Sequence, residues 1–352
     1  MSRAIRVAPY TEEWVHAVRA FNQRIATSQQ QLPETPRPDW MPRMEVFLAV
    51  EDDAVRGGYI LRRQCFWTAG QETAVAHYRL PLSEGAVNRD YATLGLRLVR
   101  DALAREPRLY AMGMGGWDKP LPQMLKRLGW RMCEVPFFFK VLRPSRFLRN
   151  IRPLRTTALR RLALDVAAFS GAGALGMRLM RHGARVSPPK HEMPNTFSSW
   201  AGEVWQRARH SYAMIAQRDA ATLDALYPSS DARFQRVRTS GGWAVLLNTQ
   251  MRDHKQFGDM RVGSIVDCLA PPGQAGDVMR AATAVLENSG VDLIISNQLY
   301  QAWSRALHDA GFRAGPSNYL LALSPALAAL AGDAADHDFH FNRGDGDGPI
   351  HL

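Results

Sequence analysis

Residues able to do chemistry gather in the second half of the chain, after an apolar run that ends at Cys268. Asp267 lies near the end of that run and is the carboxylate best placed to act as a general base. A loop of small residues follows, and small residues let a phosphate approach the free N–H groups at the start of a helix. The residues expected to bind a phosphorylated cofactor are Leu269, Gly273, Gln274, Ala275, Gly276 and Asp277.

Each candidate also has a structural alternative. Asp267 can pair with one of the many arginines, and Cys268 alternates to the opposite face of the strand, where a core position is expected. The loop can be an ordinary Pro-Gly turn that ends in Asp277 as a helix cap. His77 and Tyr78 occupy the corresponding strand of the first half, where we expect them to be buried or to pair at an edge.

The stretch Val291–Phe312 shows how such residues are positioned. An apolar run long enough for one buried strand passes through a polar turn into a helical pattern, in which apolar residues recur every three or four positions. Gly311 is placed to end that helix in the left-handed conformation. The pattern predicts strand, turn and helix in succession.

Composition describes a folded protein with reduced thiols. The 352 residues exceed one ordinary core, so we expect two domains. The chain carries 44 Lys and Arg against 33 Asp and Glu, a net charge of +11 that suits anionic partners. Three cysteines without CxxC spacing argue against a disulfide framework or a zinc site. The amino terminus lacks the apolar core of a signal peptide, and no apolar run reaches the ~20 residues of a spanning helix.

The chain also repeats itself. The strand, turn, helix and glycine-aromatic order of Val291–Phe312 recurs at Arg108–Trp130. Upstream, the pair Gly57-Gly58 matches Gly241-Gly242, and the spacing from the second glycine of each pair to the helix-ending glycine is 71 residues in one half and 69 in the other. A common order at near-equal spacing predicts a tandem duplication.

The repeated unit resembles the GNAT superfamily of acyl-CoA N-acyltransferases. Asp118 stands eleven residues before Gly129, as the late motif of that family expects, and the pairs Gly129-Trp130 and Gly311-Phe312 supply its end. The usual tyrosine acid is replaced by Leu125 in the first half and by Leu307 in the second. The pyrophosphate loops depart from the family pattern as well: the loop at 88–95 offers Arg89 but little glycine, and the second-half loop keeps a glutamine and one close glycine.

The resemblance implies an α/β fold with a mixed sheet flanked by helices in each of two tandem GNAT-like domains. It also implies that an acyl-CoA, acetyl-CoA or another, binds where two neighbouring strands splay apart. Asn297 and Tyr300 follow the second such strand, where the family contacts CoA or protonates its sulfur. The second domain is therefore expected to hold the cofactor, with Asp267 and Tyr300 as catalytic residues and no metal.

We expect domains at 1–145 and 191–330, a basic connector helix at 146–190 and an acidic Gly/Asp tail at 331–352. The connector is either a solvated linker or a helix lying on an anionic membrane surface through 146–185. The tail is either a flexible end or a lid over a basic cleft. Its Asp-Gly-Asp-Gly run resembles a calcium loop without the required glutamate.

The expected function is transfer of an acyl group, with acetyl the expected one, to an amino or hydroxyl group of a sugar or cell-envelope precursor. More distantly, the two-domain length and the ending His340–Pro349 resemble GNAT-type proteins of bacterial polysaccharide synthesis. The alternative is a catalytically inactive interaction or membrane-surface module of a polysaccharide assembly system. We expect a cytoplasmic protein, peripheral at the inner face of the membrane if the connector binds there. Nucleic acid is not an expected partner, because the chain has no recognisable docking helix or aromatic-basic strand face.

Overall fold

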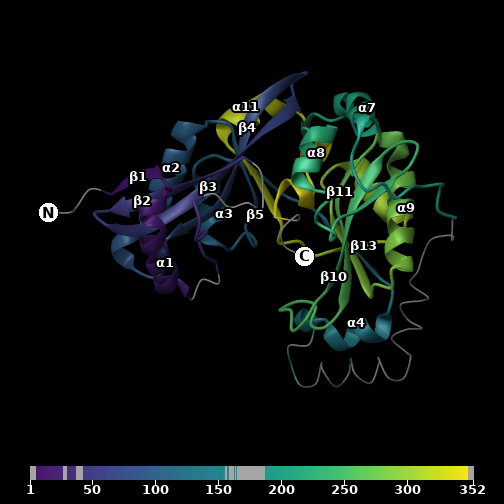
Figure 1. The fold of residues 1–352 in the computed structure, drawn as a ribbon, viewed down its shortest axis with the longest axis horizontal. Helices are drawn as coiled ribbons and strands as arrows, with labels where there is room; N and C mark the ends of the chain where they lie inside the picture. Colours follow the sequence, from purple (N-terminus) through teal and green to yellow (C-terminus); the bar gives the residue numbers. More distant parts are fainter. Residues whose placement is uncertain are drawn as a thin grey trace. The chain divides into compact units, whose positions relative to one another are not determined.

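The computed structural model describes residues 5–26, 30–36, 43–154, 157, 162, 164 and 187–347 (Figure 1). The chain forms two compact units, and neither is continuous in sequence. Unit 1 comprises Met1–Cys133 and Leu320–Asp333, and unit 2 comprises Glu134–Tyr319 and Ala334–Leu352. The chain therefore passes from one unit to the other three times.

Unit 1 is a mixed sheet with helices on both faces. Its strand order is β1 (Arg6–Pro9), β2 (Met44–Glu51), β3 (Ala54–Thr68), β4 (Gln71–Ser83), β5 (Leu109–Gly113), β14 (Leu320–Leu323) and β6 (Arg131–Glu134). One face packs on α1 (Val15–Arg24) through an apolar cluster that includes Phe21 and Ile60. The other packs on α2 (Leu94–Arg105) and α3 (Pro120–Arg127) around Tyr59, Leu98 and Leu125.

Unit 2 is a second mixed sheet in the order β13 (Arg313–Gly315), β7 (Phe137–Val141), β12 (Leu293–Asn297), β11 (Arg261–Leu269), β10 (Trp243–Gln250) and β9 (Gln235–Arg238). Its helices include α7 (Ser199–Ala208), α8 (Ala220–Leu226), α9 (Ala275–Asn288) and α10 (Gln301–Asp309). Apart from this sheet, β8 (Met214–Ala216) pairs in parallel with β15 (Phe339–His340).

Apart from β1, the strands of the unit 1 sheet correspond in order to the six strands of the unit 2 sheet, with one exchange. In unit 1 the parallel pair β4 and β5 is followed by β14, and in unit 2 the parallel pair β11 and β12 is followed by β7. Each unit thus takes this strand from the other half of the sequence. Figure 1 shows the consequence in colour, since the yellow α11 (Pro325–Ala331) lies among the blue elements of unit 1.

This exchange changes the domain boundaries expected from the sequence. The strand Phe137–Val141 was expected to close the first domain but pairs with β12 and β13 of unit 2. The sequence pattern identified it correctly as a strand, because a local pattern reports the conformation of a segment and not its long-range partner. In the same way, Leu320–Leu323 was expected in the second domain and pairs with β5 of unit 1.

The connector and the tail also differ from expectation. The connector begins with α4 (Pro144–Asn150), whose buried Phe147 and Leu148 pack in an apolar cluster of unit 2. Most of the predicted connector helix, and hence the membrane-surface hypothesis, lies outside the described residues. The described part of the tail, 331–347, is not a separate flexible end, because it enters unit 2 and residues such as Asn342 and Asp345 are buried. Within the described part of the chain, every helix is too short or too polar to cross a membrane.

The glycine pairs noted in the sequence lie where the backbone comes close to a neighbouring strand end. A Cβ on Gly57 would lie 2.6 Å from the carbonyl oxygen of Leu82, and a Cβ on Gly242 would lie 2.3 Å from that of Leu269. Leu82 and Leu269 lie at the ends of β4 and β11. Any larger residue would clash with the neighbouring strand, so both positions require glycine.

We expect Gly242→Ala to lower the free energy of unfolding by about 1–3 kcal/mol, because the added methyl group meets a backbone oxygen that cannot move aside alone. Gly273→Ala is the matched control, since no atom lies within 4 Å of its added Cβ, and it should stay within about 0.5 kcal/mol. Urea unfolding of both variants measures the difference. Equal stabilities would contradict this packing.

Candidate functional site

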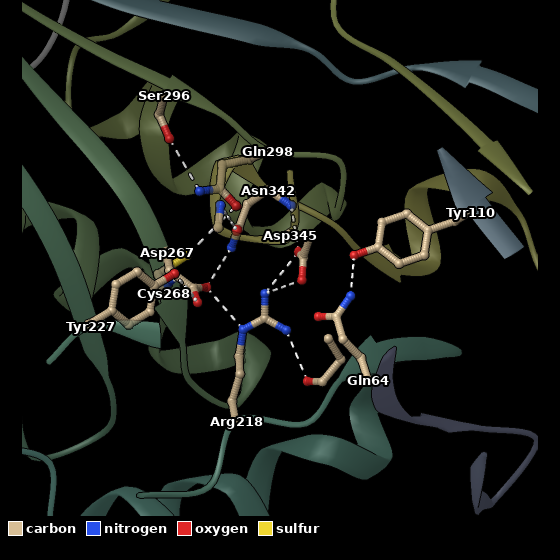
Figure 2. A network of polar contacts seen from close by, with 12 residues as sticks. Gln64, Tyr110, Arg218, Tyr227, Asp267, Cys268, Ser296, Gln298, Asn342 and Asp345 are labelled. Carbon is tan, nitrogen blue, oxygen red and sulfur yellow. Dashed lines mark hydrogen bonds and ion pairs between the residues drawn. The ribbon is translucent and has the colours of Figure 1, made fainter. Parts of the chain in front are cut away.

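The predicted base, Asp267, lies in the interior of unit 2. A bulge at Val266 breaks the register of β11 with β10, and the pairing of β11 with β12 ends one residue earlier, at Ile265 and Ser296. The Asp267 side chain is 1% exposed and accepts hydrogen bonds from Arg218, Tyr227 and Asn342 at 2.8–2.9 Å (Figure 2). The backbone amide of Cys268 also donates to this carboxylate at 2.8 Å. A carboxylate held by four donors is poorly placed to accept a substrate proton.

Arg218 is the centre of this network. Its Nε donates to Asp267 at 2.9 Å, its Nη1 to the carbonyl of Ala216 at 2.9 Å, and its Nη2 to both carboxylate oxygens of Asp345 at 2.8 and 2.9 Å. Burial alone would lower the pKa of Arg218, but Asp267 and Asp345 raise it, so the guanidinium stays charged. The Asp345 carboxyl is also buried, and burial raises its pKa against the opposing effect of Arg218.

The segment Phe339–Asp345, called the strap below, lies in the gap that opens between β11 and β12. Its Asn342 bridges to Gln298, which follows β12, and donates to Asp267 on β11. Gly344 lies against both Asp267 and the hydroxyl of Tyr227. The cleft in which the sequence placed an acyl-CoA is therefore filled by the chain itself.

The remaining predicted residues of this region also contact structure. Asn297 accepts a hydrogen bond from Arg343 of the strap at 3.2 Å. Tyr300 precedes α10, donates to the carbonyl of Ser211 at 3.2 Å and packs edge-on against Tyr212, with ring centroids 4.6 Å apart. Burial raises the pKa of Tyr300. These contacts fix Asn297 and Tyr300 near the strap and leave neither facing an open cleft.

The predicted phosphate loop leads into the N-terminus of α9. Leu269 is buried at the end of β11, and Gly273 and Gln274 belong to a short 3-10 turn before α9. Ala275 and Gly276 open α9, whose first turn has no side-chain cap. Asp277 places a carboxylate in that turn and pairs with Arg280, which opposes the approach of a phosphate.

Unit 1 contains the corresponding parting of two strands. The strands β4 and β5 pair only through Ala76–Leu109 and His77–Tyr110, although they continue to Ser83 and Gly113. Two residues of β4, Leu80 and Pro81, lie opposite one residue of β3, and Leu80 has a positive φ of 45°. This bulge turns β4 away from β5, as expected where a proline interrupts a strand ladder.

Polar residues gather at the point where β4 and β5 part. The rings of His77 and Tyr110 stack with centroids 4.4 Å apart, and the Tyr110 hydroxyl accepts hydrogen bonds from Arg62 at 3.0 Å and Gln64 at 2.5 Å. His77 is 1% exposed and its Nδ1 has no hydrogen-bond partner. Burial lowers the pKa of His77 well below its usual range, and Arg79 and Arg62 lower it further, so the imidazole is neutral.

The helix that follows this cleft begins without an acid. Thr93 precedes α2 and provides no side-chain cap, so the first amides of α2 have no intrahelical partner. No acidic residue lies in the first turn, and Arg89 is exposed in the preceding 3-10 turn. The start of α2 is therefore a more favourable anion site than the start of α9.

The sequence favoured the second unit, because the two candidate phosphate loops were compared by their glycine content. Pro81 inside a strand pattern was the available signal, since proline within a sheet indicates a bulge or an edge. The role of His77 had no such signal, because its neutral, unpartnered state depends on burial and on two arginines of the folded sheet. Leu125 and Leu307, which replace the family tyrosine, are both fully buried.

The fold is similar to those of solved structures. No family model and no curated protein matches the sequence. A protein of unknown function from Enterococcus faecalis, a probable N-acyltransferase, is 10% identical over 93% of this chain and 74% of its own, with a TM-score of 0.52. A GCN5-related N-acetyltransferase from Anabaena variabilis is 10% identical over 90% and 72%, with a TM-score of 0.53.

The N-myristoyltransferase of Saccharomyces cerevisiae, solved with bound myristoyl-CoA, is 8% identical over 92% of this chain and 82% of its own, with a TM-score of 0.51. Identities this low establish the fold alone. The GNAT-type fold and the mixed α/β class expected from the sequence are thereby confirmed. Among the described residues, no group of three His, Cys, Asp or Glu side chains is arranged to hold a metal ion.

We expect Arg218→Met to lower the free energy of unfolding by about 3–5 kcal/mol, because it leaves two buried carboxylates without their cation. Arg233→Met is the control, since Arg233 pairs with Asp231 at the surface, where its side chain is 58% exposed. That variant should change stability by less than about 1 kcal/mol. Urea unfolding of both variants tests the assignment, and similar losses would refute it.

Proposed function

We propose that the protein is an acyl-CoA-dependent acyltransferase whose acyl-CoA binds in the cleft between β4 and β5 of unit 1. The main support for this proposal is the contrast between the two units. In unit 1 the strands part beside an uncapped helix start without an acid. In unit 2 the corresponding gap holds the strap, and Asp277 lies at the helix start.

The residues where β4 and β5 part suit acyl transfer. As an amine attacks the thioester carbonyl, the C–N bond forms, the C–S bond breaks and the amine loses a proton. We assign that proton to Nδ1 of His77, which is neutral and has no hydrogen-bond partner. We assign protonation of the leaving thiolate to Tyr110, because Arg62 and Gln64 donate to its oxygen and stabilise the phenolate left behind. These two residues replace Asp267 and Tyr300 in the proposed catalytic roles.

The proposed acceptor is an amino or hydroxyl group of a sugar or cell-envelope precursor, and the acyl group is acetyl. The net charge of +11 supports an anionic acceptor such as a phosphorylated or nucleotide-linked sugar. We also propose that the two units arose by duplication, which the common order of six strands in their sheets supports. The second candidate function is an inactive interaction module, favoured by the filled cleft of unit 2 and by Leu125 and Leu307.

A matched pair of variants locates the cofactor. Gly95 and Gly276 are each the second residue of their helix, α2 and α9, and neither has a neighbour closer than 3.3 Å to an added Cβ. Gly95→Asp should weaken acetyl-CoA binding at least about tenfold, because the new carboxylate meets the pyrophosphate, whereas Gly276→Asp should leave binding unchanged.

Calorimetric titration of the full chain with acetyl-CoA measures both effects, with one site per chain expected. An aspartate in the first helical turn favours the helix, so loss of folding does not explain a loss of binding. The reverse pattern would place the site in unit 2. No binding by the wild-type chain at high micromolar ligand would favour the inactive module.

The role of His77 is tested by His77→Gln, a neutral side chain that cannot take the proton. With the fastest acceptor from a panel of primary amines and amino sugars, CoA release should slow by about 10²-fold or more. Acetyl-CoA binding, measured by the same calorimetry, should be unchanged. A variant that retains the wild-type rate would remove His77 from the mechanism.

A further inference from the structure

The strap reaches its cleft as a segment separate from the rest of unit 2. The chain leaves unit 2 after Tyr319, contributes β14 and α11 to unit 1, and returns at Ala334. The residues that line the cleft, Arg218, Tyr227, Asp267 and Gln298, all precede this excursion. The residues that line the cleft thus come from a part of the chain that precedes the strap. The strap contacts them as a tethered ligand contacts its binding site.

Side chains of unit 2 contact the residues at the polar end of the strap individually. Arg218 holds the Asp345 carboxylate, and Asp267 accepts from the Asn342 amide at 2.8 Å. A Cβ on Gly344 would lie 2.4 Å from the Tyr227 hydroxyl and 3.0 Å from Asp267, so only glycine fits. These contacts specify an asparagine, a glycine and an aspartate at fixed spacing.

The turn of the strap is held by hydrogen bonds within the strap itself. The Asn342 side chain accepts from the amide of Gly344 at 2.9 Å, and Asp345 accepts from the amide of Asn342 at 3.0 Å. This reciprocal pair lowers the conformational entropy lost when the segment enters the cleft.

The aromatic end of the strap adds backbone pairing and burial. Phe339 and His340 pair in parallel with Met214 and Ile215 of β8, which is strand addition. Phe339 and Phe341 are 0% and 1% exposed, and the His340 ring lies edge-on to Tyr212 with centroids 4.8 Å apart. The amide of Leu299 donates to the Phe341 carbonyl at 3.0 Å.

We propose that unit 2 is a peptide-recognition unit and that its cleft binds the sequence Phe-His-Phe-Asn-Arg-Gly-Asp, supplied by the chain's own strap. The gap between strands that takes an acyl-CoA in the proposed function of unit 1 takes a peptide segment in unit 2. This inference stands whether or not unit 1 binds acyl-CoA, because every contact that carries it lies within unit 2.

The test replaces the strap in trans. In the full chain Asp345→Asn, the resident strap loses the carboxylate that Arg218 holds. A fluorescein-labelled peptide of residues 336–347 should bind this variant with micromolar affinity by fluorescence anisotropy. It should bind the wild-type chain at least about tenfold more weakly, because the tethered strap competes at high effective concentration. The same peptide carrying Gly344→Ala or Asp345→Asn should lose binding to the variant.

Hydrogen exchange of residues 339–345 supplies the second measurement. Amides of the strap should exchange about 10- to 100-fold faster in Asp345→Asn than in the wild type, while those of β11 and β12 keep their protection. Gly344→Ala in the full chain, which leaves all three charges in place, should show the same local opening. Unchanged protection of the strap in both variants would overturn the proposal. Equal affinity of the wild-type and substituted peptides for the variant chain would overturn it as well.

Discussion

The buried Arg218 is the interaction on which the second unit depends. A guanidinium away from water is stable only when its donors are satisfied and its charge is balanced, and removing one partner of such a pair is strongly destabilising. Here the partners come from β11 and from the strap, two segments far apart in sequence. One side chain therefore holds the C-terminal segment beside the bulged end of β11. Asp267, which looks catalytic in the sequence, is one of the two carboxylates that make this burial possible.

The two units share a fold but differ in what lies where their central parallel strands part. In both units a bulge on the strand before the splay ends or weakens its parallel pairing, at Val266 in unit 2 and at Leu80 and Pro81 in unit 1. A gap of this kind leaves backbone N–H and C=O groups that need partners. In unit 2 the strap supplies such partners, since Phe341 accepts from the amide of Leu299 and Asn342 forms a bridge with Gln298. In unit 1 a ligand is the proposed supplier, next to a neutral histidine and an uncapped helix.

The local elements and the fold were predictable from sequence because each segment carries its own period. The strand-turn-helix of β12 and α10 and its repeat in β5 and α3 lie close to their expected positions. Long-range partners were not predictable. The acidic Gly/Asp ending has the composition of a flexible tail, and only the position of Arg218 in three dimensions makes Asp345 a buried ligand of it. The alternative role for Asp267, an ion pair with an arginine, describes its observed contacts better than the role of a base.

The strand exchange gives the end of the chain a double role. In unit 1 the ladder from β5 to β14 joins Leu109 to Ser324, 215 residues apart, and until it forms β5 has an unpaired edge. Closing so long a loop is entropically costly, although the cost grows slowly with length. The strap follows directly after β14 and α11, so residues 320–345 both complete the sheet of unit 1 and fill the cleft of unit 2.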